Sequence, residues 1–144
     1  MTMNSLPAKT TTAAPTSRPG LKVLLVDDDS FQLELMTEIL HSLSILDVTT
    51  AASGEQALQK LAGNPQRFNL MLLDLHMPGM DGFQFMESVA KVGYTGALII
   101  VSGQSDDVMH AATMVAKLRR FTLLGTLAKP VGRSALSQLI SRLA

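Results

Sequence analysis

Five short apolar runs alternate with five segments of helical periodicity, and this alternation constrains the fold more than any other feature. The apolar runs are bounded by Gly, Asp, Ser or Pro, as short buried strands are. Because a helical segment follows each run, the strands are expected to lie parallel, with helices on both faces of the sheet. The expected strands are 21–26, 46–51, 69–74, 97–102 and 122–128. The expected helices are 30–43, 54–63, 83–91, 105–120 and 132–143. The pattern predicts an α/β fold with a doubly wound parallel sheet.

Four of these apolar runs end in side chains that can take part in chemistry. These side chains are Asp27 and Asp28 after the first run, Asp74 in the third, Ser102 in the fourth and Lys129 after the fifth. In an open parallel sheet all strand C-termini share one edge, and ligands bind at that edge. We therefore expect the carboxylates, the hydroxyl and the ammonium to converge in one cleft.

This set of groups suits a divalent cation and a phosphoryl group. Mg²⁺ accepts one or two carboxylates and keeps waters for a phosphoryl ligand, so Asp27, Asp28 and Asp74 are the candidate metal residues. A carboxylate can also take a phosphoryl group to form an acyl phosphate, which makes Asp74 the candidate nucleophile. Lys129 and Ser102 offer a cation and a hydroxyl donor to the phosphoryl oxygens.

Simpler explanations exist for some of these residues. Asp29 with Gln32 forms a D-x-x-Q pattern, which explains Asp29 as the cap of helix 30–43. For Asp27 and Asp28 the alternative to a metal site is a solvated acidic turn. A lysine before a proline, as in Lys129-Pro130, is often ordinary loop, but its position at a strand end favours a role in the site. The Lys129-Pro130 bond can be cis or trans.

Composition excludes several other classes of protein. The 144 residues include no cysteine, which excludes disulfides and thiolate metal sites and suits the cytoplasm. No apolar run approaches the roughly 18–20 residues of a membrane span. The formal net charge is zero, and the basic group Lys117, Arg119 and Arg120 is expected to be a solvated helix end. We therefore expect no direct nucleic-acid partner and no membrane partner.

Residues 1–20 are rich in Thr, Ala, Pro and Ser and are expected to form a flexible tail ahead of one domain, 21–144.

Four motifs in order resemble the receiver domain of two-component response regulators, the CheY-like family. They are Val26-Asp27-Asp28, the segment from Leu72-Leu73-Asp74 to Met80-Asp81-Gly82, Val101-Ser102-Gly103, and Lys129-Pro130. The resemblance covers about residues 21–143. It implies a flavodoxin-like fold whose five strands, counted along the chain, have the order 2-1-3-4-5.

The resemblance also implies a function and its residues. Asp74 would be phosphorylated by a histidine kinase or phosphotransfer protein, with Mg²⁺ held by Asp28, Asp74 and the His76 backbone carbonyl, and by Asp27 through water. Ser102 and Lys129 would contact the phosphoryl group and carry the switch to the fourth helix, fifth strand and fifth helix. That surface would control a downstream protein or attached output domain, and it could form a homodimer. Such a protein is not an enzyme on other substrates, but it assists its own phosphoryl transfer and autodephosphorylation.

Two departures from the family pattern affect these expectations. Thr126 stands where many receivers carry an aromatic residue that turns inward on activation, so an aromatic switch is not expected. The segment from Ser102 to Lys129 is a few residues longer than usual. The sequences Ile100-Val101-Ser102-Gly103 and Leu124-Gly125-Thr126-Leu127-Ala128-Lys129-Pro130 resemble those of receivers attached to EAL cyclic-di-GMP phosphodiesterase domains.

Three other functions compete with the phosphorylated switch. Aspartyl-phosphate phosphohydrolases usually carry a second Asp two residues after the nucleophile, where this chain has His76. A receiver that only binds partners would not need the full set of acids, hydroxyl and lysine. A flavin-binding protein of the same fold would need a Ser/Thr-rich phosphate loop after the first strand, which this sequence lacks.

Overall fold

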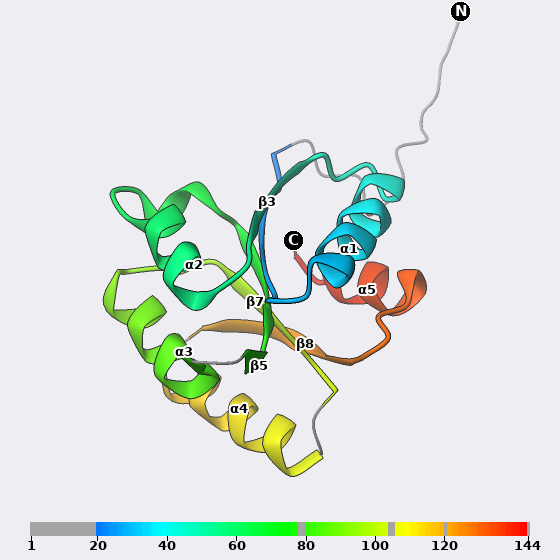
Figure 1. Ribbon diagram of the computed structural model, residues 1–144. Helices are drawn as coiled ribbons and strands as arrows, with labels where there is room; N and C mark the ends of the chain where they lie inside the picture. The colour runs from blue at the N-terminus through cyan, green and yellow to red at the C-terminus, as the bar shows by residue number, and fades with distance from the viewer. Residues whose placement is uncertain (1–19, 78–79, 104–105, 120, 144) are drawn as a thin grey trace, which may run out of the picture.

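A five-stranded parallel sheet forms the centre of the molecule (Figure 1). The computed structural model describes residues 20–77, 80–103, 106–119 and 121–143. With strands labelled as in Figure 1, the sheet contains β2 (Lys22–Val26), β3 (Asp47–Ala51), β4 (Leu70–Asp74), β7 (Ala97–Ser102) and β8 (Thr122–Ala128). The strand order is β3-β2-β4-β7-β8, and all four pairings are parallel. Counted along the chain, this is the order 2-1-3-4-5, so the predicted fold is confirmed.

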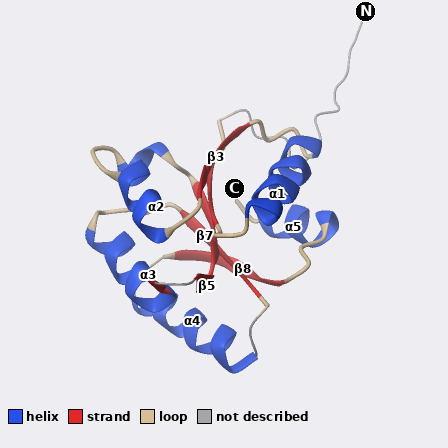
Figure 2. Cartoon of the chain, viewed as in Figure 1, coloured by secondary structure: helices blue, strands red, loops and turns tan. Residues whose placement is uncertain are grey.

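Five α-helices cover the two faces of the sheet (Figure 2). They are α1 (Ser30–Ser42), α2 (Gly54–Leu61), α3 (Gly82–Lys91), α4 (Asp106–Leu118) and α5 (Arg133–Ile140). α1 and α5 lie on one face, and α2, α3 and α4 lie on the other (Figures 1 and 2). No helix in the described part of the chain has the length and apolar character needed to cross a bilayer.

Side chains along the central strands point alternately to the two faces of the sheet, and this creates two separate cores. In β2, Val23 and Leu25 join the cluster under α1 and α5, whereas Leu24 and Val26 join the cluster under α2, α3 and α4. Successive strand residues point to opposite faces, so a strand covered on both faces is expected to be apolar on both sides until it reaches its C-terminal end. β4 and β7 are buried throughout for the same reason.

Side-chain caps define where the first two helices begin. Asp29 accepts hydrogen bonds from the backbone N–H groups of Phe31 and Gln32, as the D-x-x-Q pattern predicts. Ser53 accepts from the N–H of Gln56 at 3.1 Å, while the Gln56 side chain accepts from the N–H of Ala52. Both interactions satisfy donors that a helix N-terminus leaves unpaired.

The structure adds three features that the sequence did not predict. A short 3₁₀ helix, η2 (Pro65–Arg67), precedes β4, and two-residue strands β5 (His76–Met77) and β6 (Met80–Asp81) pair antiparallel after it. β8 also contains an irregularity, since Leu98 pairs with Leu123 but Ile99 pairs with Gly125. The extra residue turns Leu124 toward the α1–α5 core.

Gly96 lies where a side chain would collide with backbone and ring atoms at the start of β7. A Cβ atom there would lie 2.7 Å from Tyr94 Cζ and 2.8 Å from the Asn69 carbonyl oxygen. The Tyr94 hydroxyl donates to the Ala97 carbonyl at 2.6 Å, and burial raises the pKa of Tyr94 well above its usual range. The glycine therefore permits the close packing of Tyr94 against this end of the sheet.

We expect Gly96→Ala to lower the free energy of unfolding by about 1–3 kcal/mol, the usual cost of overpacking a tight site. Urea unfolding followed by circular dichroism measures the loss. Gly20→Ala is the matched control, because nothing lies within 4 Å of a Cβ atom at Gly20. Equal stabilities of the two variants would contradict this account of the β7 start.

Candidate functional site

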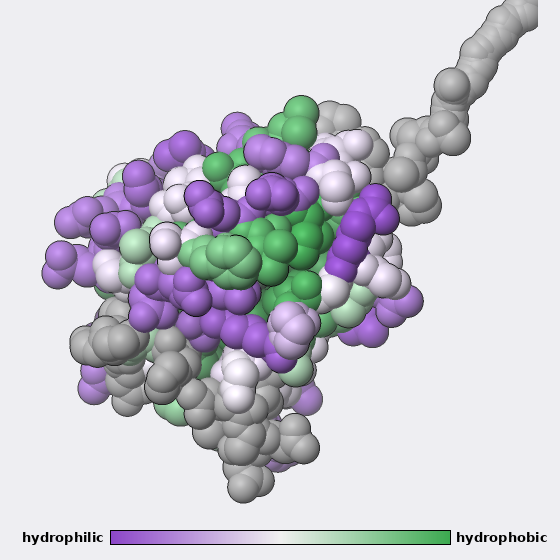
Figure 3. Space-filling model, turned by 45° about the vertical axis from the view of Figure 1, so that its right-hand side comes forward, coloured by the Kyte–Doolittle hydropathy of each residue, from purple (hydrophilic) through white to green (hydrophobic). Residues whose placement is uncertain are grey.

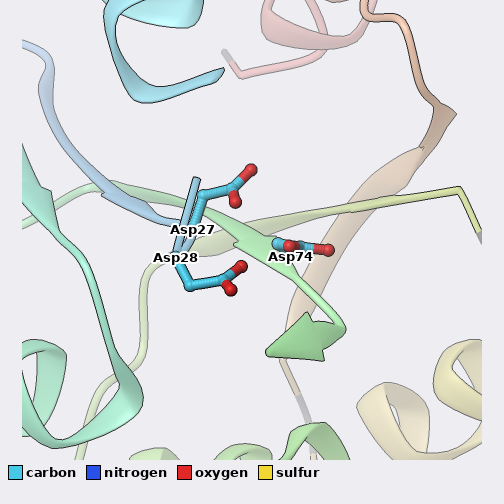
Figure 4. A group of neighbouring side chains, drawn as sticks. All are labelled: Asp27, Asp28 and Asp74. Atoms are coloured by element: carbon cyan, nitrogen blue, oxygen red, sulfur yellow. The ribbon is translucent and has the colours of Figure 1, made fainter. Parts of the chain in front are cut away.

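Predicted site residues lie at the C-terminal edge of the sheet, where Figure 4 shows Asp27, Asp28 and Asp74 as neighbours. Asp27 and Asp28 follow β2, and Asp74 is the last residue of the neighbouring strand β4. Ser102 ends β7, and Lys129 directly follows β8. Because all strands of the sheet are parallel, Asp27 and Lys129, 102 residues apart in the sequence, come together at this edge.

Three carboxylates form a compact acidic group. One oxygen from each of Asp27, Asp28 and Asp74 lies within 4.8 Å of the others. Asp27 and Asp74 are 0% and 2% exposed, whereas Asp28 is exposed. The Oδ1 atom of Asp27 accepts the N–H of Asp29 at 2.9 Å, which fixes the loop between β2 and α1.

Lys129 supplies the opposing charge. Its Nζ lies 3.1 Å from Asp27 Oδ2 and 3.3 Å from Asp74 Oδ2. Burial alone lowers the pKa of Lys129, but the adjoining carboxylates of Asp27 and Asp74 outweigh burial and hold this pKa above its ordinary value. The ammonium is therefore charged at neutral pH and bridges the two buried acids.

Backbone hydrogen bonds extend the sheet into the site loops. The N–H of Asp27 donates to the Ala51 carbonyl at 3.1 Å, and the N–H of Lys129 donates to the Ser102 carbonyl at 3.1 Å. Ser102 is 1% exposed and lies one register position beyond Val101, the partner of Asp74. The Lys129–Pro130 peptide bond, which the sequence left open, is cis.

The acidic group fits a hard divalent cation. With all groups ionised, three carboxylates and one ammonium carry a formal charge of −2. The buried Asp27 Oδ2 is paired with Lys129 by charge, but no described group meets it in hydrogen-bond geometry. Oxygen ligands and excess negative charge are the properties that Mg²⁺ selects, so the donor set fits this ion.

Other predicted residues have varied outcomes. His76 begins β5, two residues after Asp74, and its side chain lies outside the described residues. Thr126 lies in β8 and is exposed. Arg119 was expected to be a solvated residue at a helix end, but it also pairs with Glu87 of α3. Its Nε lies 2.7 Å from Glu87 Oε1, and one of its terminal nitrogens lies 2.6 Å from Oε2. Arg120 lies outside the described residues.

Sequence reasoning assigned Lys129 to the phosphoryl group but missed its contact with Asp27. The sequence did contain an indication of this contact, since a lysine at a strand end is expected to neutralise acids that lie at the same edge of the sheet. The sequence pattern alone did not determine which two of the three acids lie nearest to Lys129.

We expect Lys129→Met to cost about 3 kcal/mol of stability in metal-free buffer at neutral pH, because it removes the ammonium that lies 3.1 Å from the buried Asp27 carboxylate and 3.3 Å from that of Asp74. Lys22→Met removes a lysine from the half-exposed pair Lys22–Asp47, whose atoms lie 3.8 Å apart. That control is expected to cost less than about 1 kcal/mol. Denaturant unfolding of both variants measures the difference, and similar losses would mean that Lys129 does not compensate the buried acids.

Comparison with known proteins identifies a family. A family model, the response regulator receiver domain, matches residues 23–141. The two-component response regulator ORR24 of Oryza sativa subsp. japonica is 34% identical over 95 residues, which are 65% of this chain and 15% of that protein. ARR12 of Arabidopsis thaliana is 36% identical over 87 residues, which are 60% of this chain and 14% of that protein. The chain thus matches only about one seventh of the length of these plant regulators.

Solved structures agree with this family. A CheY-like receiver domain protein from Methanospirillum hungatei is 27% identical, with a TM-score of 0.70 and coverage of 85% of this chain and 92% of that one. The Vibrio cholerae chemotaxis protein CheY4 is 27% identical, with a TM-score of 0.69 and coverage of 86% and 98%. The family match over most of the chain, together with this shared fold, shows that the protein belongs to the response regulator receiver domain family.

Proposed function

We propose that this receiver domain is a phosphorylation-dependent switch, in which Asp74 accepts a phosphoryl group from a histidine kinase or phosphotransfer protein. The observation that carries the proposal is the buried Asp74 carboxylate, which lies among Asp27, Asp28 and Lys129 at one sheet edge. A nucleophile in this position needs close neutralising groups, because phosphoryl transfer depends on positioning and charge stabilisation.

The proposed transfer forms one bond and breaks another. A carboxylate oxygen of Asp74 attacks the phosphorus of a phosphohistidine, the P–N bond breaks, and the imidazole leaves with its electron pair and takes up a proton. The product is an acyl phosphate on Asp74. Asp28, Asp74 and the His76 carbonyl would hold Mg²⁺, with Asp27 bound through water, and the ion would supply charge neutralisation at the phosphoryl oxygens.

Lys129 and Ser102 are proposed to respond to the negative charge that phosphorylation adds at Asp74. Phosphorylation adds about −1.5 to −2 charge at Asp74. Lys129 already lies 3.3 Å from an Asp74 oxygen, and its backbone N–H is bonded to the Ser102 carbonyl. Both residues precede loops that lead into α4 and α5. The proposed output surface is therefore formed by α4, β8 and α5, and phosphorylation would shift its population between two states.

The proposed partners are a kinase or phosphotransfer protein and a downstream protein or output domain. A solved complex from Borrelia burgdorferi contains a CheY bound to CheX with BeF₃ and Mg²⁺. That complex, whose CheY has the same fold as this chain, supports a protein as the expected kind of partner.

We further propose that the chain divides into a tail, 1–20, and a receiver, 21–144. We also propose a cytoplasmic location beside such partners and a homodimer through α4, β8 and α5. The sequences of β7 and β8 support the proposal that this is either a receiver from an EAL-domain protein or a stand-alone protein built like one.

We expect Asp74→Asn to abolish phosphate uptake while leaving the fold intact, because the amide is nearly isosteric but is not a nucleophile for phosphorus. Intact mass after incubation with a small phosphodonor and Mg²⁺ measures the adduct. Asp47→Asn, on the exposed end of β3, is the matched control and should be phosphorylated as fully as the wild type. An acid-labile adduct retained in Asp74→Asn would exclude Asp74 as the acceptor.

Asp28→Asn is expected to weaken Mg²⁺ binding at least about tenfold, because it removes a carboxylate ligand from the acidic group. Calorimetric titration of Mg²⁺ measures the dissociation constant. Asp47→Asn again serves as the control and should bind Mg²⁺ like the wild type. Unchanged binding in Asp28→Asn would place the ion elsewhere, independently of whether Asp74 is phosphorylated.

Autodephosphorylation is expected to depend on His76 and Gln104, which flank the phosphoryl group in the family pattern. Replacing both with Ala should change the lifetime of the acyl phosphate, because side chains that flank a phosphoryl group in the family pattern would control the approach of the attacking water. The decay of the adduct mass over time gives this lifetime. An unchanged lifetime in the double variant would show that neither side chain controls hydrolysis.

A further inference from the structure

A groove between α1 and the edge strand β3 lies outside the site described above. It has a volume of about 550 Å³ and is lined by one face of α1 together with Thr50 of β3. Leu33 forms its buried floor, and the lining residues repeat along α1 from Ser30 to His41 at helical spacing. On the side of the molecule that carries α1 and α5, apolar surface lies in the middle and hydrophilic side chains surround it (Figure 3).

The groove carries an unbalanced negative charge. Glu34 and Glu38 both line it, and neither forms an ion pair with a residue in the described ranges. Two like charges four residues apart on a helix destabilise that helix by a few tenths of a kcal/mol. A basic segment laid in the groove would relieve this repulsion.

The N-terminal residues of the same chain have the matching chemistry. Residues 1–19 contain two basic side chains, Lys9 and Arg18, and no acidic side chain. Between these two residues the sequence Thr10–Ser17 contains only Thr, Ala, Pro and Ser, whose small side chains suit a shallow groove over Leu33 and Thr37. Proline and threonine also favour the extended backbone that such a groove accepts.

The segment also starts at the correct end of the groove. Lys22 of β2 pairs with Asp47 of β3, and Asp47 lies only five residues after the last residue of α1. Gly20, the first described residue, lies two residues before Lys22, so the segment that precedes it is expected to reach the groove from the C-terminal end of α1. The groove face of α1 rises about 17 Å from His41 to Ser30. Extended chain from Arg18 to Lys9 spans up to about 30 Å, which is more than enough.

We propose that residues 1–19 dock in the α1–β3 groove of their own chain, with Arg18 beside Glu38 and Lys9 beyond Glu34, toward Ser30. The docked segment covers the face of α1 that begins next to the acidic loop Asp27–Asp29. This proposal does not depend on phosphorylation of Asp74 or on Mg²⁺.

A spin label in the segment tests the proposal on the full chain. The chain has no cysteine, so Thr12→Cys carries a nitroxide at that position alone. In a ¹⁵N-labelled sample we expect the amides of Ser30–His41 and Thr50 to lose intensity relative to the reduced label, whereas α2 and α3 keep theirs. Loss confined to residues next to Gly20, and declining with distance along the chain, would overturn the proposal.

Two charge variants separate docking from nonspecific attraction. Glu34→Gln with Glu38→Gln removes two negative charges from the groove, and we expect the docking equilibrium constant to fall about fivefold, as for two exposed ion pairs. Glu55→Lys changes the net charge by the same amount on exposed α2 and should leave the intensity losses unchanged. Equal losses in both variants would show that the groove carboxylates do not hold the segment.

A mixed sample distinguishes the chain's own segment from that of a second copy. Spin-labelled chain without ¹⁵N is added to ¹⁵N chain without a label. We expect no loss of intensity in α1, because the segment docks within one chain. Losses at Ser30–His41 as large as in the single-chain experiment would overturn the proposal in favour of exchange between two copies.

Discussion

The ammonium of Lys129 between Asp27 and Asp74 is the interaction on which the functional edge of this domain depends. Two nearly inaccessible carboxylates cannot stay ionised side by side without a cation, and the described residues supply only this one within 4 Å. The lysine comes from the far end of the chain, so the site exists only when all the central strands are assembled. Folding and the formation of the site are therefore the same event.

Backbone hydrogen bonds keep this arrangement rigid where the strands stop. Asp27 and Lys129 each donate an N–H to the strand beside them, to Ala51 and to Ser102. The sheet pattern thus extends one residue past its formal ends and carries the charged side chains with it. Groups held in this way need little reorganisation when a ligand with new charge arrives, which is the usual condition for fast chemistry at a preorganised site.

The sequence predicted the strands and the convergence of site residues, and it failed where contacts join distant segments. β2, β4 and β7 were predictable because burial on both faces makes four or more consecutive residues of each strand apolar. The cap at Asp29 was predictable because capping is local. In contrast, Arg119, just after α4, pairs with Glu87 of α3, 32 residues earlier, and periodicity reveals a helix face but not its partner. The β5–β6 pairing was missed because two residues are too few to show alternation.

Tyr94 has a practical consequence for studying this domain. The chain has one tyrosine and no tryptophan, so Tyr94 is its main source of intrinsic ultraviolet fluorescence. It is buried at the N-terminal end of β7, whereas the acids and Lys129 lie at the C-terminal edge. Emission from Tyr94 will therefore report unfolding of the sheet and remain largely silent when an ion or a phosphoryl group binds. Optical titrations of the acidic edge will require an introduced fluorophore.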